Sequence, residues 1–142
     1  MDDADDLERF LEAQNPIFER VLAELRAGRK RSHWMWFIFP QLAGLGHSSM
    51  AAAFAIASRR QAEAYLAHQI LGTRLRQCTQ LVGDVPQRSI REIFGYPDDL
   101  KFHSSMTLFA SVAGGNRIFS DVLEKYFSGE FDQRTIELLK SP

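Results

Sequence analysis

Apolar residues recur with helical spacing along almost the whole chain, and this periodicity restricts the fold more than any other feature. Ile17, Val21 and Leu25 form one such stripe, and Leu71 and Leu75 belong to another. Intervals of three and four residues place side chains on one face of an α-helix, whereas the alternation typical of half-buried strands is scarce. The periodicity therefore predicts an all-α fold.

Capping residues, glycines and prolines divide this pattern into short helices. The expected caps and helices are, in chain order, Asn15 with 16–27, Ser48 or Ser49 with 50–57, Ser58 with the next helix, and Asp98 with a long helix reaching 112. The last helix is expected to begin at Asp132. The apolar run 34–39 fits either a buried helical turn or a short strand, and we choose a helix.

Length and composition indicate one globular domain over residues 1–142. Apolar residues make up 45% of the chain and charged residues 25%, which are ordinary values for a globular protein. A chain of this size buries a continuous core without disulfides. We expect a compact multihelical array of about eight or nine short helices.

Charge and cysteine content narrow the partners and the compartment. A formal net charge of -1 argues against a general nucleic-acid binder, which needs excess cations to displace counterions from phosphates. The lone Cys78 and the acidic start of the chain favour a cytoplasmic protein without a signal peptide. No apolar run approaches the length of a membrane span, so we expect no membrane association.

The first informative segment covers residues 28–41 and reads GRKRSHWMWFIFPQ. Lys30 and the arginines beside it could hold a phosphate or carboxylate, and Ser32 could cap a short helix whose amides face the anion. Trp34 or Trp36 could stack on a planar ring. The alternative is a solvated basic loop followed by aromatic residues of the core.

His33 is the candidate acid or base of this segment, because the pKa of an unperturbed imidazole lies near neutral pH. The alternative is a structural histidine whose ring bonds to a backbone carbonyl. The four histidines of the chain show no short ligand spacing with one another, and there is no cysteine pair. We therefore expect neither a metal nor another cofactor.

The second informative segment covers residues 98–109 and reads DDLKFHSSMTLF. On a helix, Lys101 and Ser105 lie one turn apart on one face, with Ser104 beside them. Lys101 could activate the Ser105 hydroxyl as a nucleophile, or the lysine and the hydroxyls could together bind an oxyanion. In the structural alternative, these small residues permit close helix packing, and their hydroxyls bond to carbonyls one turn earlier.

Long strings of the sequence resemble an uncharacterised, mostly bacterial family of helical domains that genomes often label calpastatin-like. The clearest are ELRAGRKRSHWMWFIFPQLAGLG and IFGYPDDLKFHSSMTLF. The resemblance implies an all-helical fold and no established reaction. The motif positions that it maps onto this chain are Ser32, His33, Trp34, Trp36, Gln41, Asp98, Lys101, Ser104, Ser105 and Thr107. We reject the calpastatin label, because inhibitors of that kind are disordered and polar.

These observations favour a small-molecule-binding domain or enzyme with a pocket built from residues 30–41 and 98–107. Its ligand would be phosphate-bearing or nucleotide-like, and any chemistry would fall to His33, Lys101 or Ser105. The candidate ligand-binding residues are Lys30, Ser32, Trp34, Trp36, Gln41, Asp98, Ser104 and Thr107. The alternative is a protein-interaction module that uses exposed tryptophan and basic residues.

Overall fold

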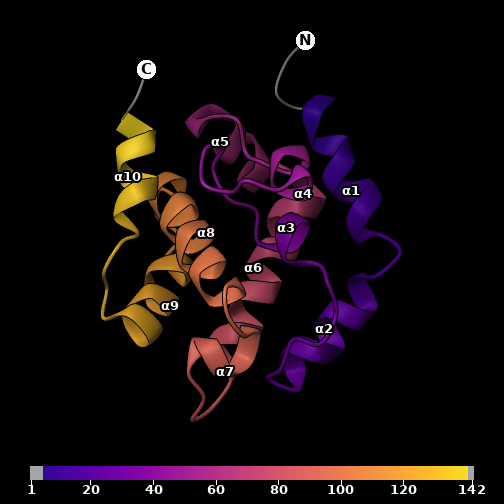
Figure 1. The fold of residues 1–142 in the computed structure, drawn as a ribbon, viewed down its shortest axis with the longest axis vertical. Helices are drawn as coiled ribbons and strands as arrows, with labels where there is room; N and C mark the ends of the chain where they lie inside the picture. Colours follow the sequence, from indigo (N-terminus) through magenta and orange to yellow (C-terminus); the bar gives the residue numbers. More distant parts are fainter. Residues whose placement is uncertain (1–4, 141–142) are drawn as a thin grey trace.

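The computed structural model describes residues 5–140, which form ten α-helices after a short 3-10 turn at Asp5–Leu7 (Figure 1). The predicted all-α class is confirmed. The helices are α1 (Glu8–Gln14), α2 (Phe18–Arg26), α3 (Met35–Ile38), α4 (Ser49–Ala53), α5 (Arg59–Ala67), α6 (Gln69–Asp84), α7 (Ile90–Phe94), α8 (Asp98–Val112), α9 (Ile118–Phe127) and α10 (Gln133–Lys140). Ten helices compare with the eight or nine expected, and α3, α4 and α7 have only four or five residues each.

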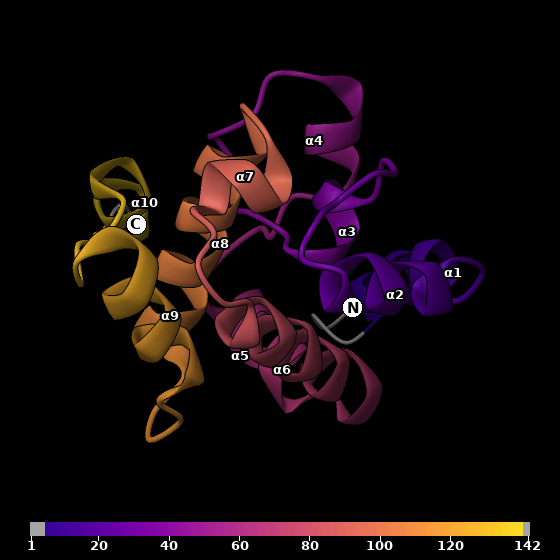
Figure 2. The same ribbon diagram turned by 90° about the horizontal axis from the view of Figure 1, so that it is seen from below.

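The two longest helices, α6 and α8, lie in the middle of the molecule. Both ribbon views show α1 and α2 on one side of them and α9 and α10 on the other (Figures 1 and 2). Helix α8 packs against α5, α7, α9 and α10, and α6 packs against α2, α5 and α9. The described apolar side chains that are buried form one continuous cluster. Within residues 5–140, no helix has both the length and the apolar composition needed to cross a membrane.

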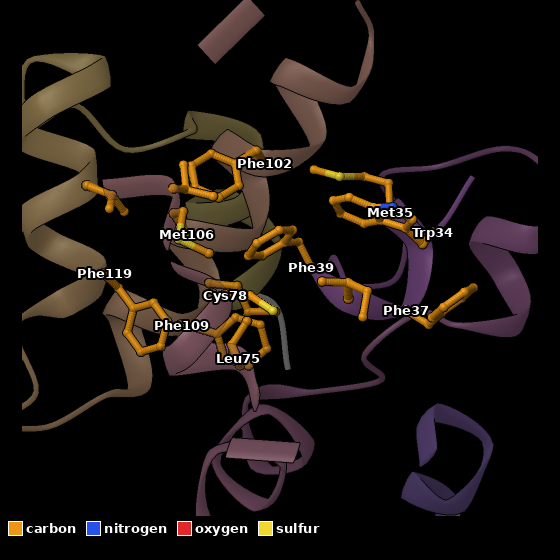
Figure 3. Close-up of a cluster of buried hydrophobic side chains, with 14 of the residues drawn as sticks. Trp34, Met35, Phe37, Phe39, Leu75, Cys78, Phe102, Met106, Phe109 and Phe119 are labelled. Carbon is orange, nitrogen blue, oxygen red and sulfur yellow. The ribbon is translucent and has the colours of Figure 1, made fainter. Parts of the chain in front are cut away.

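The apolar run 34–39 supplies much of this core. Residues 35–38 form α3, so the choice of a helix over a strand is confirmed. Figure 3 shows Phe39 in the middle of the labelled cluster, with Trp34 and Met35 on one side and Met106 and Phe109 on the other. Ring centroids of Phe39 and Phe102 are 5.0 Å apart, which joins this segment to α8. The core thus holds the two segments singled out in the sequence against each other.

Capping explains several of the helix starts. The side chains of Ser48 and Ser58 accept hydrogen bonds from the backbone N–H groups three residues later, as their positions predicted. Asp132, the predicted start of the last helix, accepts the corresponding bond from the Thr135 N–H. The helix predicted over 16–27 is α2, but its predicted cap and start were wrong. The helix begins at Phe18, and Asn15 ends α1 with its N–H bonded to the Leu11 carbonyl.

The segment 43–55 leaves the core and returns to it. It begins and ends at a parallel bridge between Leu42 and Ile56, where the Ile56 N–H donates to the Gln41 carbonyl over 2.8 Å. This pairing requires extended backbone at Ile56. The predicted end of this helix at residue 57 is therefore wrong, and α4 ends at Ala53. None of the side chains from 43 to 55 is buried. The segment therefore lies at the surface, where its half-buried Leu45 and Phe54 pack against the core.

Candidate functional site

A buried carboxylate, Glu24, shapes the loop that joins α2 to α3. It is 8% exposed and accepts hydrogen bonds from the backbone N–H of Arg31 (2.8 Å) and of Ser32 (3.0 Å). It also accepts from the Ser32 hydroxyl (2.6 Å) and from the Trp34 indole N–H (2.9 Å). Ser32 and Trp34 are thus engaged inside the protein. The Trp34 ring, at 1% exposed, has no free face for a ligand.

The ionisation of Glu24 follows from these contacts. Burial opposes the charged form, but the hydrogen bonds from Ser32, Arg31 and Trp34 outweigh that penalty and lower the pKa of the Glu24 carboxyl. Glu24 is therefore an anion at neutral pH. Its negative charge orders a loop that carries three consecutive cations.

Asp98 joins two lysines from the two segments. Its carboxylate lies 2.9 Å from the Lys30 ammonium and 3.5 Å from the Lys101 ammonium. The Lys30 ammonium also lies 5.3 Å from the Trp34 ring centroid, and the Lys101 ammonium 5.2 Å from that of Trp36. The structure therefore brings together these five predicted site residues. The side chain of Lys30 is only 9% exposed, whereas that of Lys101 is 27% exposed.

The predicted role of Asp98 as the cap of α8 was wrong. Asp98 is the first residue of the helix, Pro97 takes the capping position, and no side chain caps this end. The carboxylate turns to Lys30 and Lys101 instead. Its negative charge still lies in the first turn of α8, where the helix dipole favours it.

Two adjoining cavities open beside Lys101. The first, of about 240 Å³, is lined by Trp36 and Phe54 and by small residues of the segment 43–55. The second, of about 220 Å³, is lined by Lys101, Ser104, Arg134 and others. Gln41 and Gly46 line both cavities, so the predicted residue Gln41 lies between an aromatic compartment and a charged one.

Ser104 and Thr107 fasten α10 to α8. The Ser104 hydroxyl lies 3.2 Å from a carboxylate oxygen of Asp132, and the Thr107 hydroxyl accepts from the Asp132 N–H over 2.9 Å. Both hydroxyls also bond to backbone carbonyls one turn earlier, at Leu100 and at His103. These contacts fit the structural alternative for both residues. Ser104 also lines the charged cavity.

The other two catalytic candidates are not joined to Lys101. The Ser105 hydroxyl is fully buried and has no hydrogen-bond partner among the described residues, Lys101 included. His33 is exposed and lines neither of the two cavities. In this conformation His33, Lys101 and Ser105 therefore do not form a hydrogen-bonded catalytic group.

The buried Ser105 hydroxyl leads to a stability prediction. Ser105→Ala should leave the free energy of unfolding unchanged or raise it by up to ~1 kcal/mol, because the substitution removes a desolvated group that makes no hydrogen bond. Thr107→Val removes a bonded hydroxyl and should lower the same quantity by ~1–2 kcal/mol. Urea unfolding of the two variants measures both values. A loss for Ser105→Ala as large as that for Thr107→Val would show that the Ser105 hydroxyl makes a bond in solution.

Two charged residues of this region, Arg134 and Glu24, were not predicted from the sequence. Arg134 belongs to the last helix and reaches the charged cavity only because Asp132 anchors the start of α10 on α8. Glu24 follows Val21 by three residues and so shares the buried face of α2, a spacing that could have marked it. Within residues 5–140, no three His, Cys, Asp or Glu side chains are grouped as a metal site requires.

The comparisons with known proteins agree with the resemblance seen in the sequence. Residues 4–139 match the family described as "Protein of unknown function (DUF1810)". The chain belongs to this family. The crystal structure of the conserved hypothetical protein Rv1873 from Mycobacterium tuberculosis is similar to this DUF1810 chain, with 55% sequence identity and a TM-score of 0.95. That match covers 96% of this chain and 98% of the mycobacterial one. No curated protein matches the chain.

Proposed function

We propose that this DUF1810 protein binds a small anionic molecule, phosphate-bearing or nucleotide-like, in the two cavities that meet at Gln41. The position of Lys101 carries this proposal. Its ammonium faces the Trp36 ring, lines the charged cavity and is partly open to solvent. Lys30 shares the same carboxylate but is nearly buried. Lys101 is thus the lysine of the pair that a ligand can reach.

The charge balance around Lys101 favours an anion. Two ammonium groups share the single carboxylate of Asp98, which leaves a positive excess at the partly exposed end of the group. Arg134 adds a guanidinium to the same cavity, and that group is suited to paired hydrogen bonds with a phosphate or carboxylate. Asp132 also lines this cavity, and the hydrogen bonds from the Ser104 and Thr135 hydroxyls do not cancel the charge of its carboxylate. The excess is therefore one positive charge, with Lys30, Lys101 and Arg134 against Asp98 and Asp132.

The adjoining cavity suits the apolar part of such a ligand. Trp36 and Phe54 provide aromatic walls, and Ala51 and Ala52 of α4 leave room for a flat group. Each cavity is smaller than a typical ligand pocket of about 300–1,000 Å³, so a ligand of nucleotide type would have to occupy both. Gln41, a residue whose side-chain amide can donate and accept, lines both cavities where the two parts of the ligand would meet.

The proposed location of the protein is the cytoplasm. The proposal assigns no reaction to the bound molecule. Burial raises the pKa of the single thiol, Cys78, to about 12, so this cysteine is not a nucleophile in the folded protein. Of the three catalytic candidates, Lys101 alone lines the proposed site. Any chemistry at the bound anion would therefore involve the Lys101 ammonium.

Thermal-shift measurements with nucleotides, sugar phosphates and inorganic phosphate test this proposal. A ligand at a hundred times its Kd stabilises the native state by about 2.7 kcal/mol, which corresponds to a rise in Tm of roughly 8 °C for a domain of this size. Lys101→Met keeps the apolar stem but removes the charge. We expect it to weaken binding by about 10- to 100-fold, the value of a hydrogen bond to a charged group.

Lys140→Met is the matched control, because Lys140 is exposed at the far end of α10 and lines neither cavity. It should leave the ligand-induced shift unchanged. If Lys101→Met and Lys140→Met weaken ligand binding equally, the attraction is a general effect of charge, and the proposed site is contradicted. A screen in which none of the anions raises Tm would also contradict it.

A further inference from the structure

A further cavity, of about 340 Å³, lies where α2 and α6 end, and it shares no lining residue with the proposed ligand site. Leu25, Leu81 and Val85 give it apolar walls. The exposed side chains of Arg26 and Arg88 line it as well, together with the single carboxylate of Asp84. It is therefore an apolar hollow with a cationic margin.

The segments around this cavity carry more arginines. The Lys30 N–H donates to the Ile93 carbonyl over 2.7 Å, which holds the loop after α2 against α7. Across residues 26–31 and 84–92, the exposed charged side chains are Arg26, Arg29, Arg31, Arg88 and Arg91 on one hand and Asp84 and Glu92 on the other. Within residues 6–140, none of these five arginines forms an ion pair. These two segments therefore carry five exposed arginines against two exposed carboxylates, although the chain as a whole has a formal charge of -1.

The walls of the cavity are held by specific contacts. Lys125 of α9 donates to the carbonyls of Gly83 (2.7 Å) and Val85 (2.9 Å) and so fixes the turn after α6. Gly28, at φ +74°, lets the chain leave α2 close to that turn, where a Cβ atom would lie 3.1 Å from a methyl carbon of Val85. The hollow is therefore formed before any partner arrives, which reduces the entropy lost on binding.

We propose that this cavity and its arginines, called here the arginine face, bind an acidic peptide segment of a partner protein. One apolar side chain of the segment would enter the hollow, and flanking carboxylates would pair with Arg26 and Arg88. Arginine is suited to this because its planar guanidinium binds a carboxylate through two parallel hydrogen bonds. The apolar walls and the carboxylate of Asp84 favour a peptide over nucleic acid, whose continuous phosphate charge needs no apolar hollow.

Fluorescence anisotropy with two labelled peptides tests the arginine face. Both peptides carry the same number of glutamates, which flank a central leucine in one and a glycine in the other. The leucine peptide should bind about tenfold more tightly, because one more apolar side chain is buried. Arg26→Glu and Arg88→Glu should each weaken both peptides by about tenfold or more, since each replaces attraction by repulsion.

Three further variants separate the effect of the hollow from that of its charge. Ala27 lines the cavity and is exposed, so Ala27→Leu should fill the hollow and reduce the affinity of the leucine peptide to that of the glycine peptide. Ala23→Leu, one turn earlier on α2 and outside the cavity lining, should change neither affinity. Arg117→Glu, at an exposed position before α9, is the control for net charge and should weaken binding far less than Arg26→Glu.

Three results would overturn the proposal. One is equal weakening by Arg117→Glu and Arg26→Glu, which would indicate attraction without a defined site. Another is equal affinity of the two peptides, which would show that the hollow takes no side chain. The third is a single-stranded oligonucleotide of matched charge that binds more tightly than the leucine peptide and displaces it, which would assign the arginine face to nucleic acid.

Discussion

Glu24→Ala is expected to lower the free energy of unfolding by about 3–5 kcal/mol, because it removes a buried charged acceptor and leaves its donors without a partner. The indole N–H of Trp34 then has no water to replace the carboxylate, because the ring is 1% exposed. The loop between α2 and α3, which carries Lys30, should become more mobile in this variant. Chemical denaturation at neutral pH measures the loss.

Glu24 should also make the protein sensitive to acid. Its pKa is lowered in the folded state, so its stabilisation is fully present above the ordinary glutamate pKa of about 4.3 and disappears as the pH falls through the folded value. Glu24→Gln has no carboxyl group at this position and should lose less stability than the native protein between about pH 5 and pH 3. Glu137→Gln, on the exposed side of α10, should follow the native curve. Parallel curves for the native protein and Glu24→Gln would show that Glu24 does not contribute as proposed.

Asp98→Ala should cost about 3 kcal/mol, because removing one partner of a largely buried ion pair leaves an uncompensated charge. The Lys30 side chain is 9% exposed and has no other carboxylate within ion-pair distance among residues 6–140. Lys101 would then add repulsion to the same region. Urea unfolding of Asp98→Ala against the native protein gives the difference.

A double substitution tests whether the cost comes from the unpaired charge. Lys30→Met together with Asp98→Ala removes both members of the closer pair and should recover at least half of the loss, since replacing a buried pair by apolar groups is often nearly neutral. If the double variant is no more stable than Asp98→Ala alone, the cost arises from helix α8 or from packing, and the ion pair has little part in it.

The sequence predicted the helices well where one residue decides the boundary. Ser48 and Ser58 cap as expected, because a side-chain oxygen at the first turn needs only a local backbone partner. The predicted end of α4 was wrong because a contact distant in the sequence decides it. Ile56 is extended by its pairing with Leu42, a contact fourteen residues away that no local pattern contains.

The site was harder to predict than the fold, because burial decides what each polar residue can do. Trp34 and Trp36 are two residues apart and look equivalent in the sequence, yet Glu24 binds the first inside the protein while the second lines a cavity. Asp98 fits a helix cap by position, but its carboxylate pairs with Lys101 one turn along α8 and with Lys30 of the other segment. The second of these is a tertiary contact that no local pattern contains. Arg134 lies outside both predicted segments and reaches the site only through the docking of α10.

An NMR titration of the isotope-labelled protein with adenosine monophosphate tests the central claim most directly. Binding in the two cavities should shift the amide signals of Gln41, Gly46, Lys101 and Arg134 together, along one saturable curve, while signals near Arg88 stay fixed. Shifts confined to the arginine face, or a complete absence of saturable shifts at millimolar ligand, would contradict the assignment of the Gln41 cavities as the ligand site.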